Sequence, residues 1–230
     1  MNLTNQRLAL HVGTVAFLVL VGGAFLVAGW IPPPSPNKSH ADIAEMFHDH
    51  DRVRVAAAMF FFGGALFVAP CAVITAQMRR IEGRNHVLAD IQIVSAAIGV
   101  IALQIPGALW LAISYRDGLD ESVIVTLNDV AWFFLLGAVG SAVMQNAALA
   151  ATILGSDGRV YPRWLGYVNL WLITGLLFGI FIPFFKTGPL AWNGALGFWV
   201  VAIDFFIWVF LMWNRTAVAI GSEAEQPAPA

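Results

Sequence analysis

The chain has 230 residues, of which 59% are AVILMFWYC and only 11% are charged. Soluble domains carry charge on about a quarter of their residues, so this composition excludes an ordinary soluble domain and indicates a membrane protein. The formal charge of −2, from 12 basic and 14 acidic residues, argues against a nucleic-acid partner, because such a partner needs a basic surface.

Six apolar stretches are long enough to cross the hydrocarbon core of a bilayer, which takes about 20 residues. In chain order they are residues 8–30, 53–78, 87–115, 123–154, 164–185 and 195–213. Most connections are short, so neighbouring spans are expected to pack antiparallel. The sequence therefore predicts an all-α polytopic transmembrane helix bundle with six spans, a single domain over residues 1–213, and a disordered cytoplasmic tail over residues 214–230.

The longest connection, between the first two spans, carries its own helix signals. Ser39 and Asp42 have the spacing of a capping box. Ile43 and Phe47 then recur at helical spacing. We therefore expect a short amphipathic helix on the outer surface, from Ser39 to Asp51.

Three histidines of this connection raise the question of a metal site. His48 and His50 would point about 200° apart on a helix and could not chelate one ion, and His40 has no CxxC or HExxH context. No metal and no cofactor is predicted.

Basic residues set the expected orientation. Arg79, Arg80 and Arg84 cluster in one short loop, and the positive-inside rule places such loops in the cytoplasm. Both termini are then cytoplasmic. Cys71 is the sole cysteine, and in an apolar helix it is expected to act as a small hydrophobe.

Aromatic residues near the span ends are expected to anchor the protein at the two membrane interfaces. The inner set follows Pro162, and an outer set lies near the opposite ends of the spans. These sets are Trp164, Tyr167 and Trp171 on the inner side, and Trp30, Trp110 and Trp192 on the outer side.

Asp204 is the single charged residue of the last predicted span, at the tenth of its nineteen positions. An ionisable group at that depth is costly and is expected to face the bundle interior. No Lys or Arg lies comparably deep, and desolvation disfavours the charged form. We therefore expect a neutral Asp204 hydrogen-bonded to an Asn, Gln or hydroxyl of the fourth or fifth span. It would either join helices or handle protons and substrate.

Other spans also present polar side chains. On an ideal helix Asn128 and Asn146 share one azimuth, and Asp90 and Gln104 lie about 40° apart. The complete candidate set is Asp204, Asp129, Asn128, Gln145, Asn146, Asp90, Gln104 and Asn169. A shared polar interior would satisfy them together. Either at least two of the three aspartates face one cavity, or each is satisfied separately.

Three segments carry a resemblance to a known family: QMRRIEG (77–83), YPRWLGYVNLW (161–171) and FFKTGPLAWNG (184–194). There the chain resembles a family of uncharacterised bacterial multi-pass integral membrane proteins, mainly actinobacterial. The resemblance extends over nearly all of the chain and implies the bacterial cytoplasmic (inner) membrane. It implies no activity and transfers no functional residue.

Three functions are compatible with these observations. The first is a small transport or transport-accessory protein with a protonatable Asp204. The second is a membrane-embedded enzyme, or enzyme partner, that acts on a lipophilic substrate with Asp204 or Asp129 as general acid. The third is a non-catalytic scaffold. The expected partners are the lipid bilayer and either a lipophilic small molecule or a proton. A cavity near Asp204, and the side to which it opens, would discriminate between the three.

Overall fold

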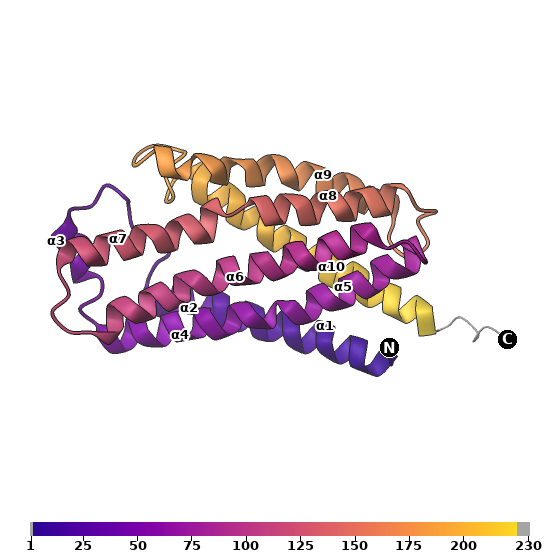
Figure 1. Cartoon of the computed structure of the whole chain (residues 1–230), viewed down its shortest axis with the longest axis horizontal. Helices are drawn as coiled ribbons and strands as arrows, with labels where there is room; N and C mark the ends of the chain where they lie inside the picture. Colours follow the sequence, from indigo (N-terminus) through magenta and orange to yellow (C-terminus); the bar gives the residue numbers. More distant parts are fainter. Residues whose placement is uncertain (1, 225–230) are drawn as a thin grey trace.

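The computed structural model describes residues 2–224, and the regular secondary structure of these residues is helical throughout. Six helical segments are long and apolar enough to cross a membrane. They are Leu3–Ala28, Asp51–Glu82, Val87–Tyr115, Glu121–Leu154, Arg163–Phe184 and Ala195–Ala224, numbered here as spans 1 to 6. The predicted all-α bundle of six spans is thereby confirmed, and the chain is a multi-pass membrane protein (Figure 1).

Five of the spans are interrupted or change helix type. Span 1 consists of α1 (Leu3–Phe17), the π-helical η1 (Leu18–Gly22) and α2 (Gly23–Ala28). Span 2 joins α4 (His50–Leu66) to α5 (Val68–Glu82), and span 3 is the continuous α6 (Val87–Tyr115). Span 4 consists of α7 (Glu121–Trp132), the π-helical η2 (Phe133–Gly137) and α8 (Gly140–Leu154). Span 5 joins α9 (Arg163–Leu176) to the 3₁₀-helical η3 (Leu177–Phe184), and span 6 joins the π-helical η4 (Ala195–Val200) to α10 (Val201–Ala224).

The interruptions have local causes. Pro70 has no backbone N–H, so the Leu66 carbonyl loses its α-helical partner where α4 gives way to α5. In span 4 the helix breaks at Ala138, whose ψ of 40° lies outside the helical region, within a run of small residues that begins at Gly137. The break lies near the middle of the span. Helix breaks at membrane depth are tolerated where they are buried in protein or line a cavity.

The six spans form a ring in chain order. Each span packs against the next one, and α10 of span 6 closes the ring against α1 of span 1. Helix α1 begins and α10 ends at the same end of the bundle, here called the termini end; the opposite end, which carries α3 (His40–Glu45), is called the loop end (Figure 1).

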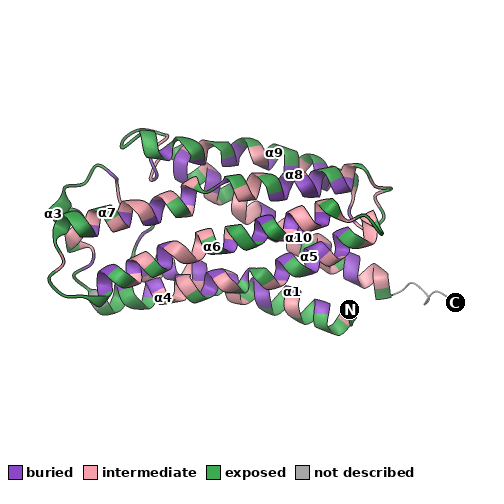
Figure 2. Cartoon of the chain, viewed as in Figure 1, coloured by how far each residue is buried: buried purple, intermediate pink, exposed green. Residues whose placement is uncertain are grey.

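The surface of the bundle is apolar, and its mostly apolar interior also holds polar side chains. Large apolar side chains such as Leu26 and Phe62 are 71% and 66% exposed, whereas Gln77, Gln92 and Asn128 are buried. Figure 2 shows exposed and buried positions alternating along each span, as expected when one helix face meets lipid. Lipid therefore takes the place of water as the solvent of the outer surface.

The surface helix forms, but it is shorter than predicted. Ser39 and Asp42 make the capping box, and Ile43 is buried where α3 packs against α7. The helix ends after Glu45 rather than continuing to Asp51. The Asp49 carboxylate accepts a hydrogen bond from the Arg52 N–H and starts α4 independently, so the predicted single helix to Asp51 is wrong.

Two further predictions need correction. Helix α10 continues to Ala224, so residues 214–224 are not a disordered tail; residues 225–230 lie outside the described part of the chain. The three tryptophans expected in an outer belt, Trp30, Trp110 and Trp192, are all buried. They pack against one another and against Trp132 instead of facing the interface.

Candidate functional site

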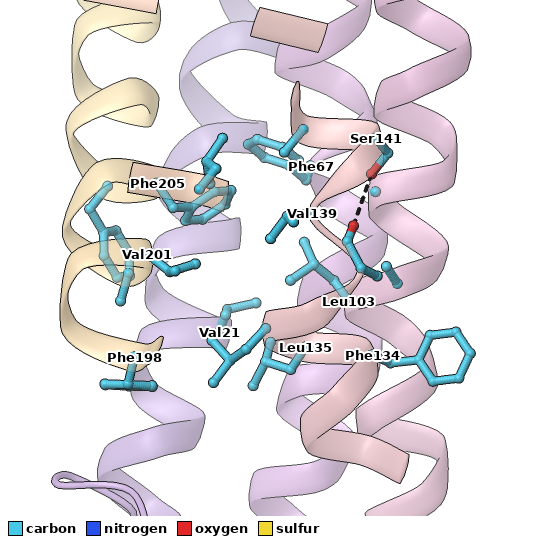
Figure 3. A pocket seen from close by; sticks show the side chains of 18 of the residues that line it. Val21, Phe67, Leu103, Phe134, Leu135, Val139, Ser141, Phe198, Val201 and Phe205 are labelled. Carbon is cyan, nitrogen blue, oxygen red and sulfur yellow. Dashed lines mark hydrogen bonds between the residues drawn. The ribbon is translucent and has the colours of Figure 1, made fainter. Parts of the chain in front are cut away.

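A cavity of about 290 Å³ lies inside the ring, at the level where span 4 is broken. All six spans contribute to its wall, for example Val21, Phe67, Leu103, Leu176 and Phe205 together with span 4. Figure 3 shows Phe198, Val21 and Leu135 near the loop end of the cavity and Phe67 and Ser141 near its termini end.

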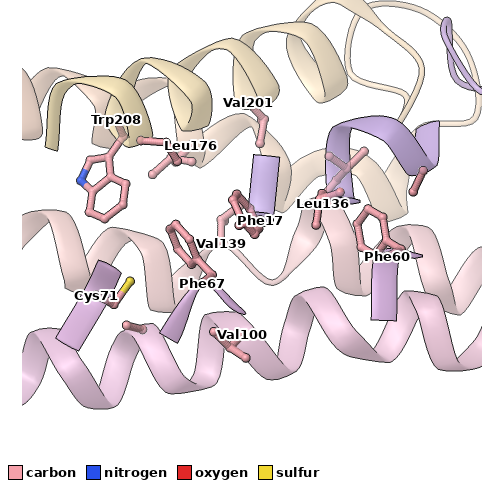
Figure 4. Packing of buried hydrophobic residues seen from close by; sticks show 14 of the residues in the cluster. Phe17, Phe60, Phe67, Cys71, Val100, Leu136, Val139, Leu176, Val201 and Trp208 are labelled. Carbon is pink, nitrogen blue, oxygen red and sulfur yellow. The ribbon is translucent and has the colours of Figure 1, made fainter. Parts of the chain in front are cut away.

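The irregular parts of the spans converge on this cavity. Val21 and Gly22 of η1, Leu136 of η2 and Phe198 of η4 all line it, and Leu176 lies where α9 gives way to η3. Figure 4 shows Leu136, Val139, Leu176 and Val201 gathered around the break in span 4. Departures from α-helical geometry in four spans therefore occur at one place in the fold.

A close backbone approach positions the broken helix. A Cβ atom on Gly179 would overlap the carbonyl oxygen of Leu136. Only glycine at position 179 lets η3 lie directly against η2, so this residue fixes the position of the wall that η2 and Val139 form.

The wall of the cavity is almost entirely apolar and carries no charged side chain. Its polar side chains are Ser141 and Gln145, which lie one turn apart on the same face of α8. The Gln145 amide donates a long hydrogen bond of 3.7 Å to the Cys71 thiol, and Ser141 donates one of 3.5 Å to the Ala138 carbonyl. Such a cavity fits an uncharged, mostly apolar molecule.

The cavity opens sideways, toward the lipid-facing surface. Trp199 and Ile203, on one face of span 6, are 40% and 52% exposed and also line the cavity. Phe134 and Ala138 of span 4 are exposed lining residues as well, so the cavity also approaches the surface on that side. Spans 1 and 6 are joined mainly through α1 and α10, on the termini side of the cavity. Toward the loop end the seam between these spans is bridged by the rings of Phe25 and Phe198, whose centroids are 6.3 Å apart.

An aromatic cluster closes the loop end of the cavity. Trp132 stacks on Trp192 at 6.0 Å and meets Trp110 at 5.5 Å, and Trp30 meets Trp110 at 4.6 Å. Trp192 donates a hydrogen bond to the Pro34 carbonyl at 2.8 Å, which fastens the proline-rich connection over this end. The cluster separates the cavity from the loop-end surface.

Asp204 faces the bundle interior and is 5% exposed. Its carboxyl packs against Gly175 of α9, where any Cβ would overlap it, and it is not part of the cavity wall although Ile203 and Phe205 are. We find no hydrogen bond from its side chain to any residue within 2–224. Asn169, one of the amides that could have been its partner, instead accepts from Trp208 at 3.1 Å and donates to the Leu165 carbonyl. Asp204 is thus beside the cavity but turned away from it.

The other predicted aspartates lie elsewhere. Asp90 is at the termini end, where it pairs with Arg79 at 2.8 Å and with His86 at 3.1 Å. Asp129 is in α7, toward the loop end, and one of its oxygens is buried without a partner among the described residues. No two of the three aspartates line the cavity, so the shared polar interior has no support.

The predicted amides are also distributed over the bundle. Asn128 accepts a hydrogen bond from Trp110 at 3.2 Å, and Asn146 donates to the Ala142 carbonyl within α8. Their common azimuth assumed an ideal helix, and the π-helical turn and break between them invalidate that assumption. Gln104 is partly buried in α6. Gln145 is the one predicted site residue that lines the cavity.

A polar network holds the termini end together. Gln77, fully buried, donates to Gln6 at 2.6 Å and to Glu223 at 3.3 Å, and its carbonyl accepts from Arg80. Arg80 also pairs with Glu223 at 3.2 Å. This network joins spans 1, 2 and 6.

The Glu82 carboxylate makes a second junction at this end. It accepts from the Leu88 and Ala89 N–H groups at 3.0 and 2.9 Å and from Thr152 at 3.0 Å. It thereby caps α6 and links spans 2, 3 and 4. Close by, burial raises the pKa of Tyr161, whose hydroxyl forms a hydrogen bond with Thr216 at 2.9 Å. These contacts tie neighbouring spans of the ring.

Sequence reasoning found Gln145 but missed the cavity. The sequence signal of the cavity is the run of small residues at 137–142 in the middle of span 4. A glycine-interrupted span is a known pointer to a binding site in membrane proteins.

Within residues 2–224 no group of three or more His, Cys, Asp or Glu side chains is placed to hold a metal ion. Comparison with protein-family models, with curated proteins and with solved structures finds no match. Functional conclusions must therefore come from the geometry of this chain.

Proposed function

We propose that this membrane protein binds an uncharged lipophilic small molecule in the cavity between its six spans, and that the molecule enters from the lipid through the seam between spans 1 and 6. The observation that carries the proposal is the cavity itself, 290 Å³ of almost wholly apolar space beside a broken span. It is roughly twice the size of the ~150 Å³ cavity that takes up benzene in a soluble protein.

Binding explains the geometry better than the other functions considered. Proton-coupled transport through Asp204 needs that carboxyl on a path through the bundle, yet it packs against Gly175 outside the cavity wall. Acid catalysis on a bound lipophile needs Asp204 or Asp129 in the wall, and neither lines it. A pure scaffold gives no reason for four irregular segments to surround one cavity.

The proposed location is the bacterial inner membrane, with both termini in the cytoplasm. Two observations support it. One is the expected resemblance of segments 77–83, 161–171 and 184–194 to bacterial membrane proteins, and the other is the cluster of Arg79, Arg80 and Arg84 where α5 ends, at the end of the bundle where α1 begins (Figure 1).

A quenching experiment tests the binding proposal. The protein is placed in lipid nanodiscs with rising mole fractions of 1-bromooctane, whose bromine quenches tryptophan fluorescence on contact. Trp199 lines the cavity and reports occupancy. We expect a saturable component of quenching above the linear component that lipid-facing tryptophans give.

Matched glycine substitutions identify the source of that component. A Cβ on Gly22, in the cavity wall, and one on Gly140, outside it, each meet no atom within 4 Å. Gly22→Leu places a side chain into the open space and should abolish the saturable component, whereas Gly140→Leu should preserve it. Quenching that stays linear in the unmodified protein, or that both variants leave unchanged, rules the proposal out.

A further inference from the structure

The amide of Gln145 is the polar group of the cavity that is least satisfied by the protein. Its side chain is 6% exposed, and its one hydrogen bond within residues 2–224 is the long contact to the Cys71 sulfur. A thiol is a weak acceptor, and the Gln145 carbonyl oxygen receives no hydrogen bond from the described residues. One strong acceptor and one further N–H are thus available on the cavity side.

An amide without a strong hydrogen-bond partner is unusual at the depth of Gln145 in the membrane. It lies seven positions after Ala138, or about 10 Å along the helix toward the termini end. The hydrocarbon core extends only ~15 Å to each side of its midplane, so water is scarce at that level. A buried amide without a partner is unfavourable, so a partner that arrives with the ligand would stabilise the complex.

The rest of the wall restricts what that partner is. No charged side chain lines the cavity, and an ionised ligand group would remain uncompensated in a medium of low dielectric constant. Ser141, one turn before Gln145, offers a weakly bonded hydroxyl as the second polar group on the same helix face. These two neutral groups of the wall are suited to bind one neutral hydroxyl or carbonyl group of a ligand.

We infer that the ligand is a neutral lipophile with a hydroxyl or carbonyl group at one end, which hydrogen-bonds to Gln145 beside Ser141 while its apolar body extends toward Phe198 and the aromatic cluster. This inference rests on the proposed binding function and adds the polar end and the orientation. Cys71 takes no part in recognition, because the thiol-bearing side chain is fully buried behind Gln145 and does not line the cavity.

A matched pair of probes tests the inference. 8-Bromo-1-octanol and 1-bromooctane differ only in the hydroxyl, and each is titrated in nanodiscs against the same tryptophan quenching. The measured quantity is the ratio of their half-saturating mole fractions, compared between variants so that membrane partitioning cancels. Gln145→Met keeps the length of the side chain and removes the amide. We expect the preference for the alcohol to fall about five- to tenfold in this variant, while 1-bromooctane binds as before.

The control is Asn146→Leu, which removes an amide from the adjacent position outside the cavity wall and should leave the ratio unchanged. Gln145→Leu serves in place of Gln145→Met should the latter not fold. An unchanged ratio in the Gln145 variant, with saturable binding intact, overturns the inference but leaves the binding function standing. Absence of saturable binding for both probes in the unmodified protein overturns both. A lower affinity for both probes alike shows that Gln145 only shapes the wall and also overturns the inference.

Discussion

The two halves of the ring are held by different kinds of interaction. The termini end is joined by directional hydrogen bonds and ion pairs, such as those of Gln77 and Glu82, between regular α-helices. The loop half has three hydrogen bonds between spans, donated by Arg52, Arg54 and Trp110, but no ion pair between spans among residues 2–224. Most of its contacts are aromatic and aliphatic, and several of its helices are irregular. Apolar packing is not directional, so it accommodates π-helical turns and a cavity that a tight hydrogen-bond network would not. The comparison indicates a fixed half and an adaptable half.

The largest loss of stability is expected at Gly179, where η3 lies directly against the backbone of η2. Gly179→Ala would force η3 away from the Leu136 carbonyl and should lower the free energy of unfolding by about 3 kcal/mol. Gly140→Ala, where a Cβ meets open space, should change it by less than about 1 kcal/mol. Denaturation in mixed detergent micelles, followed by circular dichroism, measures both. Equal stabilities would show that the span 4–span 5 contact does not constrain the cavity wall.

Removing a central member of the polar network should have the next largest effect. Gln77→Leu breaks contacts to Gln6, Arg80 and Glu223 and should cost about 2 kcal/mol, since hydrogen bonds inside membrane proteins contribute roughly 0.6 kcal/mol each and partners are left buried.

The matched control is Gln104→Leu in the middle of α6, expected to stay within about 0.5 kcal/mol of the unmodified protein. The same micelle titration measures both variants. If Gln104→Leu were the more harmful of the two, the assignment of stability to the termini end would be wrong.

The smallest expected effect is a pH response of the loop end. Hydrogen bonds from the Ser39 side chain and from the Ser39 backbone N–H hold the pKa of Asp42 below its ordinary value of 3.8. Because the folded pKa is lowered, the capping box is complete above about pH 5 and is lost as the pH falls below 3.8. Backbone chemical shifts of residues 40–45 should move toward non-helical values at low pH. Asp42→Ala removes the titrating carboxyl and should abolish that pH dependence, and a persistent response in this variant would contradict the assignment.

The number of spans was predictable because transfer of apolar residues into lipid is additive along the chain. The start of α3 was predictable because a capping box is local. The lack of a hydrogen bond to Asp204 within residues 2–224 was not predictable, since Trp208 donates to the amide oxygen of Asn169 through a contact between spans that spacing does not reveal. The burial of Trp192 was likewise unpredictable, because its indole donates to the Pro34 carbonyl, 158 positions away in the chain.

The candidate site was likewise predictable only in part. Gln145 could be proposed from its residue type and depth. The cavity beside it depends on how the irregular segments of spans 1, 4, 5 and 6 meet, and on Gly179 allowing η3 to approach η2. The irregular helix geometry arises only when the six spans pack together. The small residues at 137–142 are therefore the only sign of the cavity that the sequence carries.

Photo-crosslinking tests the central claim most directly. An alkyl diazirine alcohol of eight carbons is irradiated with the protein in nanodiscs, and the adducts are located by mass spectrometry of the span 4 and span 6 peptides. The account predicts adducts on cavity-lining positions such as Leu135, Ala142 and Phe205, with their loss in Gly22→Leu and their retention in Gly140→Leu. Adducts confined to lipid-facing positions such as Met144 and Phe210, and equal in both variants, would contradict it.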